Sequence, residues 1–127
     1  MPVIKITAMP QKDESTIPGV LTGLCLAAAR VLGCPPRTVW ATWETLKEGH
    51  YVEADSAAAV QPRDTHPPLV VVLLKEGRPP DVREHLLSAI AFELCRGLGI
   101  EEGNAFITLR ELKSGDVYTG GGVSFHR

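Results

Sequence analysis

The residue with the most unusual chemical potential in this sequence is the proline at position 2. Pro2 follows Met1, and removal of Met1 leaves a free secondary amine, whereas the nitrogen of an internal proline has no usable lone pair. Free amines have a pKa above neutral, but burial in an apolar pocket and nearby cations both disfavour the charged form. A secondary amine that is partly neutral near pH 7 can act as a general base.

The cysteines and histidines show no comparable pattern. The three cysteines are scattered without a C-x-x-C motif, which predicts small buried groups in a reducing compartment: Cys25, Cys34 and Cys95. The four histidines lack the spacing of a metal-ligand set and are predicted to be surface or turn residues: His50, His66, His85 and His126. We therefore expect no metal centre.

An internal repeat indicates which elements position the chemically capable residues. A shift of 66 residues superposes the landmarks of the two halves without a gap. The matching pairs include Pro2 with Pro68, Leu32-Gly33 with Leu98-Gly99, Trp40 with Phe106, and Leu46-Lys47-x-Gly49 with Leu112-Lys113-x-Gly115. Their coincidence at one offset predicts two copies of one unit, at about 2–64 and 67–125, within a single domain spanning 1–127.

Each copy has the pattern of a β-α-β unit. A short apolar strand opens each copy, at 3–8 and at 69–74, and a helix follows whose apolar residues recur at spacings of three and four. Gly33 and Gly99 stand where a helix C-cap belongs. Second strands are predicted at about 38–45 and 105–111, each parallel to the first strand of its copy because a helix crosses between them. The stretch 53–66 is predicted to be a surface linker, and 117–125 a β-hairpin or flexible arm.

The two units together predict an α/β (α+β) fold with a four-stranded sheet and two helices on one face. A unit of about 60 residues buries too little surface to be stable alone. Two helices cover only one face of the sheet, and the other face stays apolar and exposed. We therefore expect the chain to form an oligomer that covers this face.

Composition argues against several classes of partner. The chain has 127 residues, with 13 Lys and Arg against 15 Asp and Glu, a formal charge of -2 and a pI near 6.1. This balance favours neither nucleic acid nor a membrane surface as a partner. The longest apolar run, at 67–74, is far shorter than a bilayer span, and no secretory signal pattern is present. We expect a cytoplasmic protein.

The opening residues 1–6 (Met-Pro-Val-Ile-Lys-Ile), together with the repeat, resemble the tautomerase superfamily. This superfamily includes 4-oxalocrotonate tautomerase, 5-(carboxymethyl)-2-hydroxymuconate isomerase, malonate semialdehyde decarboxylase and macrophage migration inhibitory factor. The segment Lys75-Glu76-Gly77-Arg78 looks like the family's Leu-Glu-Gly-Arg after the first strand, and Gly49-His50-Tyr51 looks like its Gly-His-Phe after the second. The resemblance implies a homotrimer of fused units, with sheets wrapped into a barrel and helices outside.

The resemblance also implies an activity, that of an isomerase (a keto-enol tautomerase) that needs no cofactor. Its general base is the amino-terminal proline, here Pro2, and its substrates are small carboxylates with an enol or an α,β-unsaturated carbonyl. Arg78 is then the candidate for gripping the substrate carboxylate as a bidentate pair. The alternative for Arg78 is a solvated turn arginine before Pro79.

Four further residues are candidates for substrate binding. Lys75 and Arg110 are additional cations, although Arg110 could equally pair with a glutamate at a subunit interface. Tyr51 matches the family's aromatic residue and, with Trp40, is a candidate wall of an apolar pocket. Plain packing is the alternative for Trp40.

Departures from the family pattern favour simple proton transfer. Decarboxylase members carry an acidic residue near the start of the second strand, where this chain has Arg37-Thr38-Val39. The superfamily also includes the cis-3-chloroacrylic acid dehalogenases. These use a histidine on the first helix, where this chain has Ala27-Ala28-Ala29, and a tyrosine and a glutamate in the second copy, where it offers Asn104 and Gly115. The alternatives that remain are a decarboxylase or hydratase of the same superfamily, or a non-catalytic oligomeric binding protein if Met1 is retained.

Overall fold

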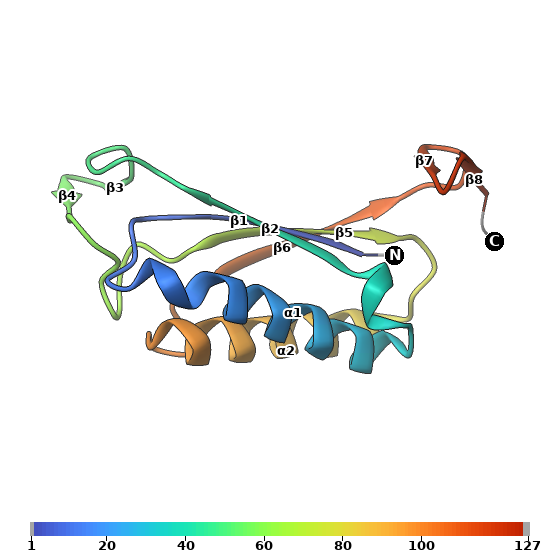
Figure 1. The fold of residues 1–127 in the computed structure, drawn as a ribbon, viewed down its shortest axis with the longest axis horizontal. Coiled ribbons are helices and arrows are strands. Elements are labelled where there is room, and N and C mark those ends of the chain that lie inside the picture. Colours follow the sequence, from blue (N-terminus) through green and yellow to red (C-terminus); the bar gives the residue numbers. More distant parts are fainter. Residues whose placement is uncertain (1, 126–127) are drawn as a thin grey trace.

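The computed structural model describes residues 2–125, and Met1, His126 and Arg127 lie outside the described residues. Its two helices lie side by side beneath a sheet (Figure 1). The elements in chain order are β1 (Val3–Ala8), η1 (Glu14–Thr16), α1 (Ile17–Leu32), η2 (Pro36–Thr38), β2 (Trp40–Thr45), β3 (Val52–Glu53), β4 (Ser56–Ala57), β5 (Leu69–Lys75), α2 (Pro80–Leu98), β6 (Phe106–Leu112), β7 (Val117–Thr119) and β8 (Gly122–Ser124).

The two predicted β-α-β units are present, and the 66-residue offset holds in three dimensions. Both helices end on a glycine in the left-handed region, with φ of 67° at Gly33 and 71° at Gly99. The second strand of each copy begins with equivalent hydrogen bonds. Trp40 N donates to Pro2 O at 3.1 Å, and Phe106 N donates to Pro68 O at 3.0 Å. The first of these strands starts two residues later than predicted, because Pro36–Thr38 forms a 3-10 turn.

The sheet has the order β2-β1-β5-β6. The central strands β1 and β5 are antiparallel, and each outer strand is parallel to its central neighbour. Alternate residues of the central strands face the helices and form the core with them. The buried core residues include Ile4, Ile6, Val70, Val72 and Leu74 from the sheet, and Leu24, Ala28, Leu86, Ile90 and Leu94 from the helices.

The opposite face of the sheet, here called the free face, carries no helix (Figure 1). Strand register arranges its side chains in three rows: Trp40–Val3–Leu73–Arg110, Thr42–Lys5–Val71–Thr108 and Glu44–Thr7–Leu69–Phe106. Its large apolar side chains remain accessible, with 39% of Leu69, 49% of Trp40 and 57% of Phe106 exposed. The expectation of an uncovered face is therefore confirmed for the single chain, but only half of the side chains in these rows are apolar.

Two small hairpins extend the sheet at opposite ends (Figure 1). The carboxy-terminal hairpin β7–β8 confirms the predicted hairpin at 117–125. The prediction of a plain surface linker at 53–66 is wrong, because β3 and β4 form the equivalent hairpin of the first copy. The prediction of a surface or turn position for His66 is also wrong, since only 1% of this side chain is exposed.

Helix α1 is an apolar core helix. The segment Glu14–Leu32 is long and apolar enough, by length and composition alone, to cross a membrane. In this fold, however, its residues Val20, Leu24, Ala28 and Leu32 are buried in the core. Asp13 caps the start of this segment, because its carboxylate accepts hydrogen bonds from the hydroxyl and the backbone N–H of Ser15. These bonds hold the pKa of Asp13 below its ordinary value.

Candidate active site

The antiparallel pairing of β1 with β5 brings Pro2 to the end of β5. Val3 is the register partner of Leu73, so the chain at Pro2 lies beside the last residues of β5, where Lys75 is. Pro2 continues the alternation of β1 and is fully buried, like Ile4 and Ile6. The candidate base therefore stands at one end of the sheet, in the low-polarity surroundings that disfavour an ammonium ion.

Two cations lie at this same end on the free face. Arg110 is the register partner of Leu73, and Lys75 is the partner of Leu112. Leu73 and Lys75 alternate with the buried Val72 and Leu74, so they face away from the helices. Arg110 stands two strands from Val3, about 10 Å at the usual strand spacing. The end of the sheet that holds Pro2 thus also holds Lys75 and Arg110.

Arg78 reaches this end from the turn after β5, and its guanidinium has a partner. Gly77, with φ of 106°, turns the chain, and Arg78 Nη1 donates to Leu32 O at 3.2 Å. That carbonyl belongs to the last turn of α1, where the helix dipole favours a cation. A guanidinium carries five N–H donors, so this contact fixes the side chain while leaving donors for a carboxylate. Arg78 is a half-buried, anchored side chain, which differs from the freely solvated turn arginine of the alternative.

Trp40 adjoins Pro2 directly, whereas Tyr51 does not. The backbone of Trp40 is hydrogen-bonded to Pro2 O, and its half-exposed side chain lies on the free face in the row of Val3 and Arg110. Tyr51 lies at the other end of the sheet, because its hydroxyl donates to Pro67 O at 2.7 Å, just before β5 begins. Within one chain, four of the five substrate-binding candidates therefore gather at the Pro2 end and Tyr51 stands apart.

Tyr51 belongs to a buried polar cluster that sequence reasoning missed. Its ring meets the edge of the His66 ring, with centroids 5.3 Å apart. His66 Nε2 lies 2.9 Å from Ser56 O, and its Nδ1 lies 3.0 Å from Thr65 Oγ1. Since a carbonyl only accepts, Nε2 carries the proton and Nδ1 accepts from the Thr65 hydroxyl. Burial, followed by the charge of Glu53, raises the pKa of the Tyr51 hydroxyl above its ordinary value. The cluster fastens the β3–β4 hairpin to the start of β5.

Asn104 is likewise structural in this fold. Its side-chain amide donates to the carbonyl oxygens of Pro62, Arg63 and Thr65, at 3.3, 3.1 and 2.9 Å. Only 6% of Asn104 is exposed. The residue therefore holds the connection between the two copies in place.

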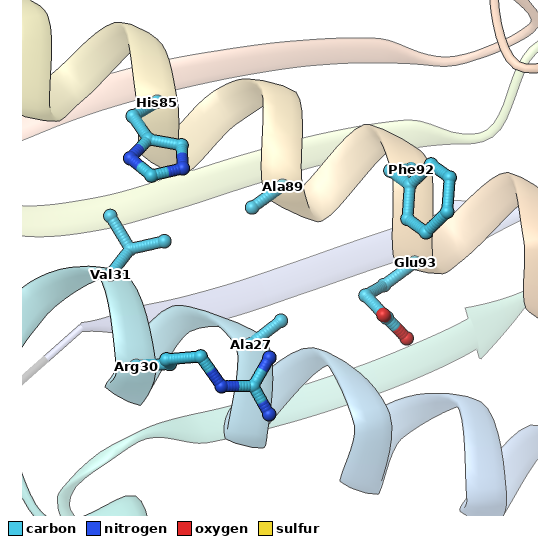
Figure 2. Close-up of a pocket in the computed structure, with 7 residues that line it drawn as sticks. All are labelled: Ala27, Arg30, Val31, His85, Ala89, Phe92 and Glu93. Atoms are coloured by element: carbon cyan, nitrogen blue, oxygen red, sulfur yellow. The ribbon is translucent and has the colours of Figure 1, made fainter.

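Two hollows of the surface can be compared as binding sites. The first, about 490 Å³, lies on the free face and is lined by Lys5, Thr7, Leu69, Val71, Leu73 and Arg110. The second, about 280 Å³, opens between α1 and α2 and is lined by Ala27, Arg30, Val31, His85, Ala89, Phe92 and Glu93. Figure 2 shows the Arg30 and Glu93 side chains extending into the second hollow from the two helices, and the Glu93 carboxylate pairs with Arg96 at 2.9 Å. Only the first hollow includes a candidate site residue, Arg110.

Other reactive groups do not form a site. Among residues 2–125, no cluster of three or more His, Cys, Asp or Glu side chains could hold a metal ion. Burial raises the pKa of the Cys25 and Cys95 thiols, and the charge of Glu102 raises that of Cys95 further. These two cysteines are therefore protonated thiols at neutral pH, which are poor nucleophiles.

Comparison with known proteins identifies the fold through solved structures. No protein-family model and no curated protein matches this chain. The chain superposes on Pt0534 inactivated by 2-oxo-3-pentynoate with a TM-score of 0.84, 23% identity, and coverage of 96% of this chain and 94% of that one. Malonate semialdehyde decarboxylase gives a TM-score of 0.73 at 18% identity, with coverage of 93% and 90%.

Fused 4-OT gives TM-scores slightly below that of Pt0534 and occurs in two assemblies. A symmetric trimer gives a TM-score of 0.83 at 20% identity, with coverage of 96% of this chain and 94% of the other. An asymmetric trimer gives 0.82 at 15% identity, with coverage of 95% and 94%. These proteins are all members of the tautomerase superfamily. The tandem β-α-β units, the strand order and these superpositions together show that this chain has the fold of the tautomerase superfamily.

Proposed function

We propose that this chain is a cofactor-independent tautomerase that uses the Pro2 amine as general base on a small enol carboxylate. The observation that carries the proposal is the strand register, which brings Pro2, Lys75 and Arg110 to the same end of the sheet, with the Pro2 ring on the helix side and the two cations on the free face. Arg78 joins them from the adjoining turn. The similarity to enzymes of the tautomerase superfamily supports a catalytic role on this scaffold.

The reaction needs a general base, cationic side chains that bind the substrate carboxylate, and a pocket that excludes water. The neutral amine of Pro2 accepts the proton of the enol hydroxyl, the C–O bond becomes a carbonyl, and the ring ammonium returns that proton to carbon. The product is an isomer of the substrate, and no other group is consumed. Arg78, Arg110 and Lys75 would hold the carboxylate and balance the negative charge that develops on oxygen. The ring of Pro2 fixes the direction of its nitrogen.

We further propose that the working form is a homotrimer. The free face leaves Trp40, Leu69 and Phe106 accessible in one chain, and fused 4-OT of the same fold is a trimer. Closing three sheets into a ring would cover the free face and exclude water from the Pro2 end. Each subunit would then supply one amine.

The pH dependence of catalysis tests the assignment of Pro2. With a 2-hydroxydienoate or phenylenolpyruvate as substrate, kcat/KM should rise with pH as the ammonium loses its proton, with an apparent pKa below that of free proline amines. Pro2→Ala keeps a primary amine and should retain a small part of the activity. A profile that is flat across the neutral range, or a Pro2→Ala variant as active as the parent chain, would remove Pro2 from the mechanism.

A further inference from the structure

An acidic residue stands between two of the cations that are proposed to bind a carboxylate. Glu76 follows Lys75 directly and precedes Arg78 by two residues, in the turn that connects β5 with α2. A carboxylate at this position repels an anionic substrate, because like charges that lie close together oppose one another. Glu76 is therefore unfavourable for carboxylate binding unless it has a second role.

Glu76 fastens the turn to the strand that carries Arg110. Its backbone N–H donates to Leu112 O at 3.1 Å, at the end of β6. Its side-chain Oε2 accepts a hydrogen bond of 3.0 Å from the backbone N–H of Ser114, in the connection between β6 and β7. Both the main chain and the side chain of Glu76 thus hold the turn against the end of β6.

Arg78 fastens the other side of the same turn. Its guanidinium donates to Leu32 O at the end of α1, and Gly77, between the two fastened residues, has a φ of 106°. Residues with a Cβ rarely adopt this φ, so the turn requires glycine at this position. The turn is therefore held between β6 and α1, and Glu76 supplies the contacts on the β6 side.

The equivalent turn of the first copy lacks this arrangement. The 66-residue offset places Pro10 at the position of the glutamate and Lys12 at that of the arginine. Pro10 has no backbone N–H, and the turn is held instead by Gln61 N, which donates to Pro10 O at 2.8 Å. Among the described residues, Lys12 forms no hydrogen bond or ion pair. This turn lies at the end of the sheet beside Pro68, whose nitrogen is an amide, and opposite to Pro2.

We propose that Glu76 is a positioning residue, which holds the turn so that Lys75 and Arg78 face a substrate carboxylate at the Pro2 end of the sheet. Its bond with Ser114 N requires an acceptor oxygen but not a charge. Glu76 is exposed, so solvent and salt weaken its repulsion of the substrate, whereas fixed cations bind without a loss of orientational freedom. This inference rests on the proposed function.

Two substitutions separate the acceptor oxygen from the charge. Glu76→Gln removes the charge and keeps an oxygen that can accept from Ser114 N, whereas Glu76→Ala removes both. With phenylenolpyruvate as substrate, Glu76→Ala should raise KM about tenfold with little change in kcat, as expected for the loss of one charge-assisted hydrogen bond. Glu76→Gln should keep KM at or below that of the parent chain. Glu84→Ala removes an exposed carboxylate from α2 and is the matched control, which should leave both constants unchanged.

The methyl ester of the same enol distinguishes positioning from a general structural role. The ester has no carboxylate for the cations to bind, so its kcat/KM should stay within about twofold of the parent value in both Glu76 variants. An equal loss with acid and ester, an unchanged KM for the acid in Glu76→Ala, or a lower KM from the loss of repulsion would each overturn this inference alone. A parent chain that converts neither compound would overturn the proposed function, and this inference with it.

Discussion

Replacing Arg78 by alanine should weaken both the fold and the proposed catalysis, by different amounts. The guanidinium donates to Leu32 O at 3.2 Å from a half-buried position. Hydrogen bonds from charged groups contribute about 1.5–3 kcal/mol, and partial exposure places this one near the lower limit. We expect Arg78→Ala to lower the free energy of unfolding by about 1–2 kcal/mol, measured by urea denaturation. The protein concentration is held fixed, because the proposed trimer would contribute to stability.

The effect on catalysis should be larger. Loss of a bidentate pair with a carboxylate in a dry site costs roughly 2–5 kcal/mol, which corresponds to a decrease of about 30-fold to several thousand-fold in kcat/KM. Arg78→Lys keeps the charge but not the planar fork, so it should recover part of the lost activity. Lys12→Ala is the matched control, because Lys12 occupies the equivalent turn of the first copy and is exposed. If Arg78→Ala loses stability but keeps its kcat/KM, Arg78 anchors α1 and does not bind substrate.

Three further outcomes follow from single contacts. The pKa of the Tyr51 hydroxyl is raised by burial and then by a neighbouring carboxylate. The folded state therefore favours the protonated hydroxyl. The stability that this hydroxyl contributes is complete below about pH 10 and is lost as the pH rises further. Tyr51→Phe should flatten this alkaline loss in urea titrations across pH. Asn104→Ala should lower the free energy of unfolding by about 1–3 kcal/mol, since it removes a buried side-chain amide that donates to three carbonyl oxygens; no change in the urea midpoint would contradict this. Gly97→Ala should destabilise by about 1–3 kcal/mol in thermal unfolding, because its new Cβ would lie 2.9 Å from a valine of α1. The control Gly19→Ala meets nothing within 4 Å and should be neutral or stabilising.

The two β-α-β units and the uncovered face of the sheet were accessible to sequence reasoning because they depend on periodicity. The alternation of Val70, Val72 and Leu74 with Leu69, Val71 and Leu73 determines which side chains meet the helices. The offset between copies then relates the two units. Hydrophobic patterns of this kind report burial directly.

The first hairpin was missed because its turn chemistry differs from that of its repeat partner. The second copy turns through Gly120 and Gly121, both with positive φ. The equivalent turn of the first copy uses Ala54, with φ of 54°, and an aspartate. A non-glycine residue in this region is uncommon, so the sequence carried no turn signal. His66 was misplaced for a related reason, because its partners are backbone and hydroxyl groups brought to it by that hairpin.

The candidate site was only partly predictable. Antiparallel pairing of β1 with β5 brings Pro2 to Lys75 and takes Tyr51 to the other end, and the sequence does not specify that pairing. The contact of Arg78 with the carbonyl of Leu32 could not be foreseen either, because a backbone acceptor leaves no mark on residue type.

The most direct test of the central claim compares two forms of one chain, with and without Met1, each verified by intact mass. In the form without Met1, the nitrogen of Pro2 is a free secondary amine. In the form with Met1, the same nitrogen is an amide, and the rest of the chain is unchanged. The account predicts that the form beginning at Pro2 converts an enol carboxylate to its keto isomer, and that the form retaining Met1 sediments as the same trimer but has no activity above the uncatalysed rate. Full activity in the Met1 form, or no conversion in either form, would contradict the assignment of Pro2 as the base.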